Sequence, residues 1–164
     1  MPGTGFVLND EMDDFALVAG KPNAFGLVGN DNSAPKPHSR PLSSMSPSFV
    51  VGPDRIGVLG TPGGSRIITI TLEGILAFID GEQPEKFVAN RRYHHQYVPD
   101  VISAEKDALS AEDIATLQAM GHRIDEAQST WGVGFMNAVS WDRKTGEMHA
   151  ASDPRGVSGS GEVH

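Results

Sequence analysis

Cysteine is absent from the 164 residues of this chain. The sequence therefore contains no disulfide, no thiolate nucleophile and no zinc–thiolate site. The absence leaves the redox compartment open, because proteins without disulfides occur in reducing and oxidising compartments alike.

Positive charge is also scarce. The chain has 13 lysines and arginines against 21 aspartates and glutamates, which gives a formal net charge of −8 at pH 7. Nucleic acids and anionic membranes favour clustered lysine and arginine. Neither is expected as the main partner, and a solvated acidic surface is the simplest interpretation.

A long hydrophobic run is missing as well. The longest, residues 67–79, is interrupted by threonines and Glu73, whereas a membrane-spanning helix needs about 20 apolar residues. We therefore expect a buried helix there and no membrane span. Residues 1–20 show no basic start followed by an apolar core, so no signal peptide is visible in the sequence as it stands.

The length and the hydrophobic content of 38% predict one domain over residues 1–164. A domain of this size buries about two-thirds of the surface of its unfolded chain. Glycine and proline are concentrated in the first half, which is therefore expected to be rich in loops. Residues 19–39 have few apolar anchors, among them Phe25, and predict a long ordered loop.

A hairpin and a helix are predicted next. Residues 48–51 and 56–60 are rich in β-forming side chains and flank a turn signal at residues 52–54. Ser65 can cap a helix over residues 67–79, and the nearly continuous apolar character of that helix predicts burial on most sides.

A second helix and a second pair of strands follow. Ser110 predicts an N-cap, with Asp113 three residues later and Gly121 at the end of a surface helix. Residues 132–141 and 147–151 flank a turn and predict two strands. Strands that bracket two helices favour an α+β or α/β domain with helices over a mainly antiparallel sheet.

Residues 10–14 carry four carboxylates in five positions. A solvated acidic turn is one interpretation, and a pocket for a cation, either a metal ion or a substrate ammonium group, is the other. The run lacks the alternating oxygen ligands and the central glycine of a helix–loop–helix calcium site, which argues against calcium.

Ser43 and Ser44 lie between Pro41 and Pro47, which stiffen the backbone. Hydroxyl groups held in this way can bind a carboxylate, although an ordinary polar turn has the same pattern. Neither serine lies in a Gly-x-Ser-x-Gly motif, so neither is predicted to be a nucleophile.

Gly63 and Gly64 precede the helix predicted for residues 67–79. Consecutive glycines let backbone N–H groups converge at the positive end of a helix dipole, which suits a developing oxyanion; a tight turn is the alternative. His94 and His95 are adjacent on an extended segment and should point to opposite faces. We therefore expect structural roles for them rather than a shared metal ion.

Taken together, five segments resemble the small subunit of γ-glutamyltransferases, also called γ-glutamyltranspeptidases, which belong to the N-terminal nucleophile class of hydrolases. The segments agree with the family in order and rough spacing and extend over nearly the whole chain. They are residues 8–15 (LNDEMDDF), 40–47 (RPLSSMSP), 62–66 (PGGSR), 92–96 (RYHHQ) and 151–155 (ASDPR).

The resemblance implies a reaction and a substrate-binding set. In this family an autocatalytic cut exposes a threonine whose hydroxyl attacks the γ-glutamyl carbonyl, and the acyl-enzyme then passes to water or an amine. By resemblance, Glu11 and Asp14 hold the α-ammonium group of the glutamyl substrate, and Ser43 and Ser44 hold its α-carboxylate.

The resemblance also assigns Gly63 and Gly64 to the oxyanion hole, and residues 19–39 to a lid with Phe25 at its tip. The family fold is an αββα sandwich, of which this chain carries an incomplete part that lacks the N-terminal strand segment and the large subunit. The implied partners are the large subunit of the same precursor, in a heterodimer, and a γ-glutamyl substrate such as glutathione. No metal or other cofactor is implied, and family habit favours the periplasm or the cell exterior.

The main departure from the family concerns the amino terminus. The family's small subunit begins with the nucleophilic threonine, whereas Thr4 is preceded by three residues and lies close to the acidic motif. We therefore expect the chain alone to be inactive, and apolar surface bared by the missing parts to favour self-association. Two alternatives stay open: a binding module for γ-glutamyl or amino acid ligands without the nucleophile, and a related acylase with another substrate.

Overall fold

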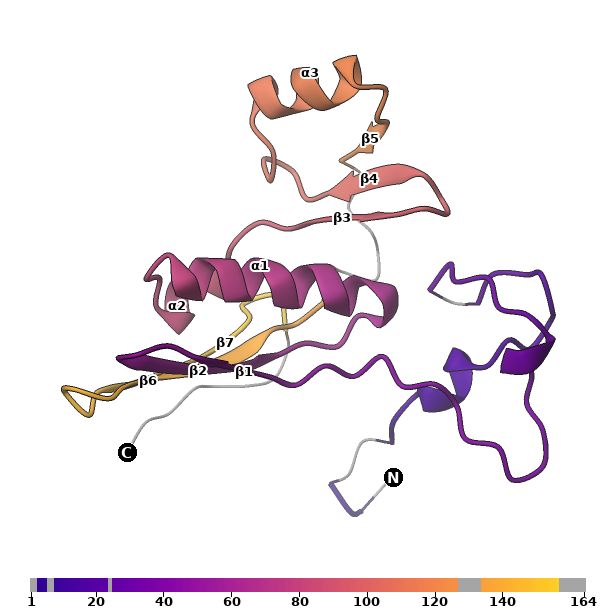
Figure 1. The fold of residues 1–164 in the computed structure, drawn as a ribbon, viewed down its shortest axis with the longest axis horizontal. Helices are drawn as coiled ribbons and strands as arrows, with labels where there is room; N and C mark the ends of the chain where they lie inside the picture. The colour runs from indigo at the N-terminus through magenta and orange to yellow at the C-terminus, as the bar shows by residue number, and fades with distance from the viewer. Residues whose placement is uncertain (1–2, 6–7, 24, 127–133, 157–164) are drawn as a thin grey trace. The chain divides into compact units, whose positions relative to one another are not determined.

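The computed structural model describes residues 3–5, 8–23, 25–126 and 134–156. The chain divides into two compact units, Met1–Ser44 and Met45–His164, and each is described by itself. Figure 1 shows the elements of both units.

The first unit contains two short 3-10 helices, η1 (Glu11–Asp14) and η2 (Asp31–Ser33). Between them the Asn23 carboxamide accepts hydrogen bonds from the N–H groups of Phe25 and Leu27, at 3.0 and 2.9 Å. The same side chain donates to the carbonyl of Asp13 at 3.2 Å. The loop predicted over residues 19–39, of which residue 24 lies outside the described residues, is thus ordered by its own hydrogen bonds.

The second unit is built on a four-stranded antiparallel sheet of order β1-β2-β6-β7. Its strands are β1 (Ser48–Val51), β2 (Arg55–Gly60), β6 (Asn137–Asp142) and β7 (Met148–Ser152). Both predicted strand–turn–strand patterns are confirmed, as the hairpins β1–β2 and β6–β7, although β6 begins at Asn137 and leaves out residues 134–136 of the predicted strand. Residues 132 and 133 of the second pattern lie outside the described residues.

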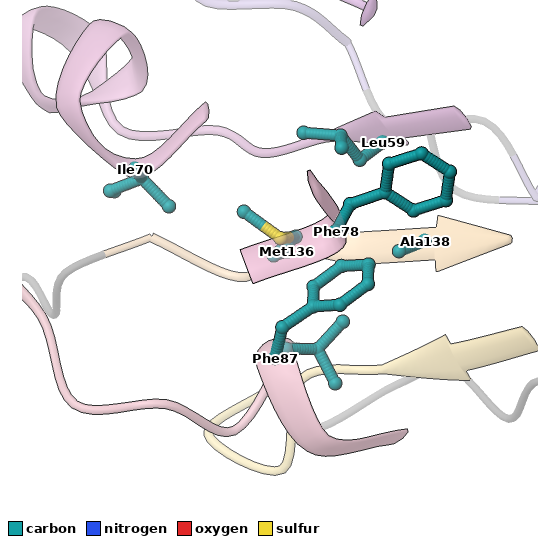
Figure 2. Packing of buried hydrophobic residues seen from close by; sticks show 7 residues of the cluster. Leu59, Ile70, Phe78, Phe87, Met136 and Ala138 are labelled. Carbon is teal, nitrogen blue, oxygen red and sulfur yellow. The ribbon is translucent and has the colours of Figure 1, made fainter. Parts of the chain in front are cut away.

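Helices α1 (Ile67–Ile79) and α2 (Pro84–Phe87) pack on one face of this sheet (Figure 1). Because side chains alternate along a strand, Leu59 and Ala138 point toward the helices and meet side chains of α1 and α2 (Figure 2). The buried cluster consists of Leu59, Ile70, Phe78, Phe87, Val88, Met136 and Ala138. The predicted α+β arrangement, with helices over a mainly antiparallel sheet, is confirmed.

The start and the burial of α1 differ from the expectations from sequence. Ser65 lies inside a 3-10 helix, η3 (Gly64–Arg66), and Arg66 occupies the N-cap position of α1 without a side-chain cap. The prediction that Ser65 caps this helix is wrong, because the 3-10 turn delays its start. The prediction of burial on most sides is also wrong, since the sheet covers only one side of α1. The side chains that remain more than half exposed are Ile68, Leu72, Leu76 and Ile79.

A second sheet of three strands follows α2. Its strands, in spatial order, are β3 (Tyr93–Gln96), β4 (Val101–Ala104) and β5 (Ile124–Asp125). The connecting helix α3 (Ala111–Ala119) has no buried residue, which confirms the predicted surface helix. The Ser110 hydroxyl accepts from the N–H of Asp113, whose carboxylate accepts from the N–H of Ser110, so the predicted N-cap is a capping box. No helix in the described ranges is long and apolar enough to cross a membrane.

The face of the four-stranded sheet that points away from α1 and α2 is apolar. The register places Val58 of β2 between Phe49 of β1 and Val139 of β6, so all three side chains lie on this face. Phe49, Val51, Val139, Trp141 and Met148 are exposed there. We call this surface the open sheet face. An exposed apolar surface of this kind is typical of a protein–protein contact.

Truncation of Ile70 to alanine should lower the free energy of unfolding by about 3 kcal/mol, because it leaves a cavity between α1 and the sheet. Met120→Ala, at the end of α3, should cost less than about 0.5 kcal/mol. The exposed fractions of the two side chains, 1% and 70%, account for the difference. Urea unfolding of both variants measures the effect, and equal losses would contradict the placement of Ile70 in the core.

Candidate functional site

The first candidate group joins the acidic turn of the first unit to its serines. Glu11 is the first residue of η1, and Ser43 follows it by 32 residues. The Ser43 hydroxyl donates a hydrogen bond to Oε1 of Glu11 at 3.1 Å. The structure therefore brings together a carboxylate and a hydroxyl for which the resemblance predicts neighbouring roles.

Asp14 ends η1 three residues after Glu11, and three residues make one turn of a 3-10 helix, so the two side chains share a side of it. Burial, followed by repulsion from Glu11, Asp10 and Asp13, raises the pKa of the Asp14 carboxyl above its ordinary value. A cation bound among these carboxylates would oppose that shift, because it stabilises the ionised form. The turn is thus electrostatically suited to an ammonium group.

A metal ion is the other cation that the sequence allows at the acidic residues 10–14. Among the described residues, no group of three or more histidine, aspartate or glutamate side chains could hold one. Binding of an ammonium group by Glu11 and Asp14 stays a prediction. Ser44 and Phe25 are half-buried in the same unit, and their roles in binding and as part of a lid stay predictions.

The second candidate group, Gly63 and Gly64, lies in the second unit, where η3 leads directly into α1. The φ angles are 147° and 57°, in a region that residues with a side chain rarely adopt. Gly64 is buried, yet within the described part of the chain no acceptor is found for the N–H group of either glycine. Two N–H groups without an acceptor in the described ranges, at the positive end of a helical segment, suit a developing negative charge.

A cavity of about 760 Å³ lies beside this turn. Its wall includes Thr61 and Pro62, the end of β2 and neighbouring parts of β6 and β7. Small-molecule sites commonly have volumes of about 300–1,000 Å³. The volume falls in that range, but the wall also includes Val58 and Val139 and does not include Gly63 or Gly64, so the cavity belongs to the open sheet face rather than to the glycine N–H groups.

A buried network of ion pairs lies in the same unit. Arg92 and Asp153 pair at 2.6 Å, with side-chain exposures of 2% and 1%. Arg155 joins Asp153 to Glu105, at 3.0 and 2.7 Å. Burial acts to raise the pKa of Asp153, but the hydrogen bond from the N–H of Arg155 and the charge of Arg92 together hold it below its ordinary value. Both arginines also donate to the carbonyl of Val88, so the network caps the end of α2.

The adjacent histidines have the structural character predicted for them. His94 is buried and His95 is exposed, which confirms that they point to opposite faces of β3. Nδ1 of His94 lies 2.8 Å from the hydroxyl of Thr69, and Nε2 lies 2.8 Å from Oε1 of Gln96. Burial lowers the pKa of His94 and thereby favours the neutral ring, and its two contacts link α1 to β3.

The residues predicted from sequence thus fall into two groups. Glu11, Asp14, Ser43 and Ser44 belong to the first unit, and Gly63 and Gly64 to the second. No role was assigned from sequence to Arg92 or Asp153, although each lies in a segment that carries the family resemblance. Their pairing is a contact between distant parts of the chain, for which a sequence pattern holds no signal.

Comparison with known proteins adds independent findings. The model of the gamma-glutamyltranspeptidase family matches residues 1–163. The chain is 45% identical over 158 residues to the glutathione hydrolase proenzyme of Pseudomonas aeruginosa, and 41% identical over 156 residues to that of Escherichia coli. Each match covers 94% of this chain but only 28% and 26%, respectively, of the relative.

Among solved structures, the gamma-glutamyltranspeptidase of Pseudomonas nitroreducens complexed with L-DON is 43% identical, with a TM-score of 0.80. The alignment covers 100% of this chain and 84% of that chain. These matches place the chain in the N-terminal nucleophile class of hydrolases. Within that class it belongs to the gamma-glutamyltranspeptidase family, as the five sequence segments predicted.

Glu73, on α1, offers a pH test of the interior of the second unit. Its Oε1 accepts a hydrogen bond from the N–H of Tyr93 at 3.2 Å, and its Oε2 is buried without a partner among the described residues. Burial is the largest effect and raises the pKa of Glu73 to about 7. Glu105 adds to the rise, while the Tyr93 hydrogen bond, Arg92 and Arg155 oppose it.

The raised pKa predicts how stability depends on pH. Because the folded protein holds this proton more tightly than the unfolded chain, the contribution is complete below the ordinary value of 4.5 and is lost as the pH rises through about 7. Glu73→Gln mimics the protonated acid, so its stability relative to the parent should increase between about pH 5 and pH 8. Urea unfolding across this range tests the prediction, and a constant difference would contradict it.

Proposed function

We propose that this chain is the small-subunit portion of an enzyme that cleaves γ-glutamyl amides such as glutathione through an acyl-enzyme. The glutamyl group then passes to water or to an amino acid. Membership of the gamma-glutamyltranspeptidase family supports the type of reaction. The two bacterial relatives are named glutathione hydrolase proenzymes, which supports the class of substrate.

The observation that carries this proposal is the hydrogen bond of 3.1 Å between Ser43 and Glu11. The α-ammonium and α-carboxylate groups of a γ-glutamyl substrate share one carbon atom, so the protein groups that bind them must be neighbours. Glu11 and Asp14 supply negative charge for the ammonium group, and Ser43 and Ser44 supply hydroxyl donors for the carboxylate. A serine hydroxyl can rotate, so Ser43 can donate to a substrate carboxylate in place of Glu11.

Gly63 and Gly64 supply the second part of the proposed chemistry. When a nucleophile attacks an amide carbonyl, the carbonyl oxygen becomes negative, and two convergent N–H donors stabilise it. Loss of one such donor typically lowers kcat by about 10²–10³-fold in acyl-transfer enzymes. On this proposal the nucleophilic threonine and an arginine for the substrate carboxylate come from parts of the precursor outside this sequence.

The open sheet face supports a large-subunit partner. This chain covers 84% of a solved chain of the family but only 26–28% of the curated proenzymes, so a protein of the family carries a second, larger portion. We propose that this portion of the same precursor contributes the other sheet of an αββα sandwich. Face-to-face packing of two sheets would then bury Phe49 and Trp141. The chain alone should self-associate through the same face.

Release of chromophore from a γ-glutamyl anilide tests the proposed function. The assay compares this chain alone with the full-length precursor that contains it. We expect activity only in the full-length protein, because the nucleophile lies in it. Activity of the chain alone would overturn the mechanism.

Two other outcomes would favour the alternatives. Binding of L-glutamate by the full-length protein without any turnover would indicate a binding module. Preference for a dicarboxylic acyl group without an α-amine would indicate a related acylase.

Asp14→Asn in the full-length protein should raise KM for the γ-glutamyl anilide by about 10- to 100-fold, because it removes a charge-assisted contact worth about 1.5–3 kcal/mol. Asp80→Asn, at the exposed end of α1, is the matched control and should leave KM unchanged. Steady-state kinetics of the two variants measure the effect. The same KM in both would argue against ammonium binding by Asp14.

A further inference from the structure

Thr61, directly before the glycine turn, connects that turn to a distant part of the chain. Its hydroxyl donates to the carbonyl of Pro62 at 2.8 Å and accepts from the N–H of Phe135 at 3.1 Å. A threonine hydroxyl has one proton and two lone pairs, so it can make both hydrogen bonds at once. The side chain thus joins two segments that are 74 residues apart.

Gly134 packs against the same turn. It is buried, with a φ of 76°. A methyl group at this position would lie 2.6 Å from the carbonyl oxygen of Pro62 and 2.8 Å from Cδ1 of Ile70. Because these distances are shorter than van der Waals contact, only glycine allows the two backbones to approach so closely.

Residues 134–136 are in turn held by the buried ion pair. Arg92 donates to the carbonyl of Gly134 at 3.1 Å, and the Asp153 carboxylate accepts from the N–H of Met136 at 3.1 Å. The Met136 side chain is part of the buried core (Figure 2). Phe135, the hydrogen-bond partner of Thr61, is therefore flanked on both sides by residues that the ion pair holds in place.

We propose that Thr61 is a positioning residue for the oxyanion donors. The carbonyl of Pro62 and the N–H of Gly63 belong to one planar peptide group and point in opposite directions. A hydrogen bond that fixes the Pro62 carbonyl therefore fixes the direction of the Gly63 N–H. A donor that is oriented before the reaction needs no reorganisation when charge develops. The inference rests on the proposed function, since only a reaction with an oxyanion uses this donor.

The test compares two substitutions of Thr61 in the full-length protein, with processing verified by gel electrophoresis. Thr61→Val keeps the shape and removes both hydrogen bonds, and it should lower kcat for the γ-glutamyl anilide by about 10- to 100-fold with KM nearly unchanged. Thr61→Ser keeps the hydroxyl and should retain most of the parent's kcat. Thr145→Val, in the exposed turn between β6 and β7, is the matched control and should behave as the parent.

A merely structural role predicts a different result. The serine variant would then lose as much activity as the valine variant, or KM would rise in proportion to the fall in kcat, and either outcome overturns the inference. Amide hydrogen exchange at Phe135 provides a readout without catalysis. If the Thr61 hydroxyl holds the N–H of Phe135, that amide should exchange faster in Thr61→Val than in Thr61→Ser. Equal exchange in the two variants overturns the inference.

The same experiment separates this inference from the proposed function. If the processed parent does not cleave the γ-glutamyl anilide, the proposed function fails, and the positioning role of Thr61 fails with it. If the parent is active and Thr61→Val is equally active, the positioning role alone fails.

Discussion

The buried pair of Arg92 and Asp153 is the interaction on which the second unit depends. Two charged groups with 2% and 1% exposure have lost their hydration, and only their attraction and further hydrogen bonds offset that loss. Val88 and Gly134 provide carbonyl acceptors for the arginine, and Met136 provides an N–H donor for the aspartate. Each of these residues lies at or near the end of α2, β3, β6 or β7. Satisfying the two charges therefore fixes where these elements meet.

A directional constraint of this kind suits the proposed oxyanion site, in which backbone N–H groups would stabilise the developing charge. Hydrophobic burial brings elements together but is non-directional, whereas hydrogen bonds and ion pairs set orientation. The direction of the Gly63 and Gly64 N–H groups is set by the backbone alone, so contacts of the surrounding backbone must orient them. The substrate-binding group proposed in the first unit has a different construction. Carboxylates and hydroxyls on a 3-10 helix and an extended segment can adjust to a ligand by rotation.

Local structure could be predicted wherever a local interaction determines it. The capping box at Ser110 and Asp113 involves residues three positions apart, and the two hairpins depend on turns of a few residues. The predictions that were wrong concern features that depend on tertiary packing. The exposure of α1 depends on how much of the helix the sheet covers, and the 3-10 turn displaced the expected cap at Ser65. The sheet of β3, β4 and β5 was not predicted, because β5 has only two residues and pairs in parallel with β4 across the intervening helix α3, a contact that no local pattern marks.

The sequence by itself determined the family, because five motifs in the right order are improbable by chance, and it determined the chemical types at the candidate site. Carboxylates at Glu11 and Asp14, hydroxyls at Ser43 and Ser44 and the paired glycines are all visible in the letters alone. Only the tertiary structure decided that Glu11 and Ser43 share a hydrogen bond, that Arg92 and Asp153 are buried together, and that Thr61 reaches Phe135. The physical reason is the separation along the chain of the residues that interact. Periodicity and capping report on neighbours within a turn or a strand, whereas desolvation and contact depend on which distant segments pack against each other.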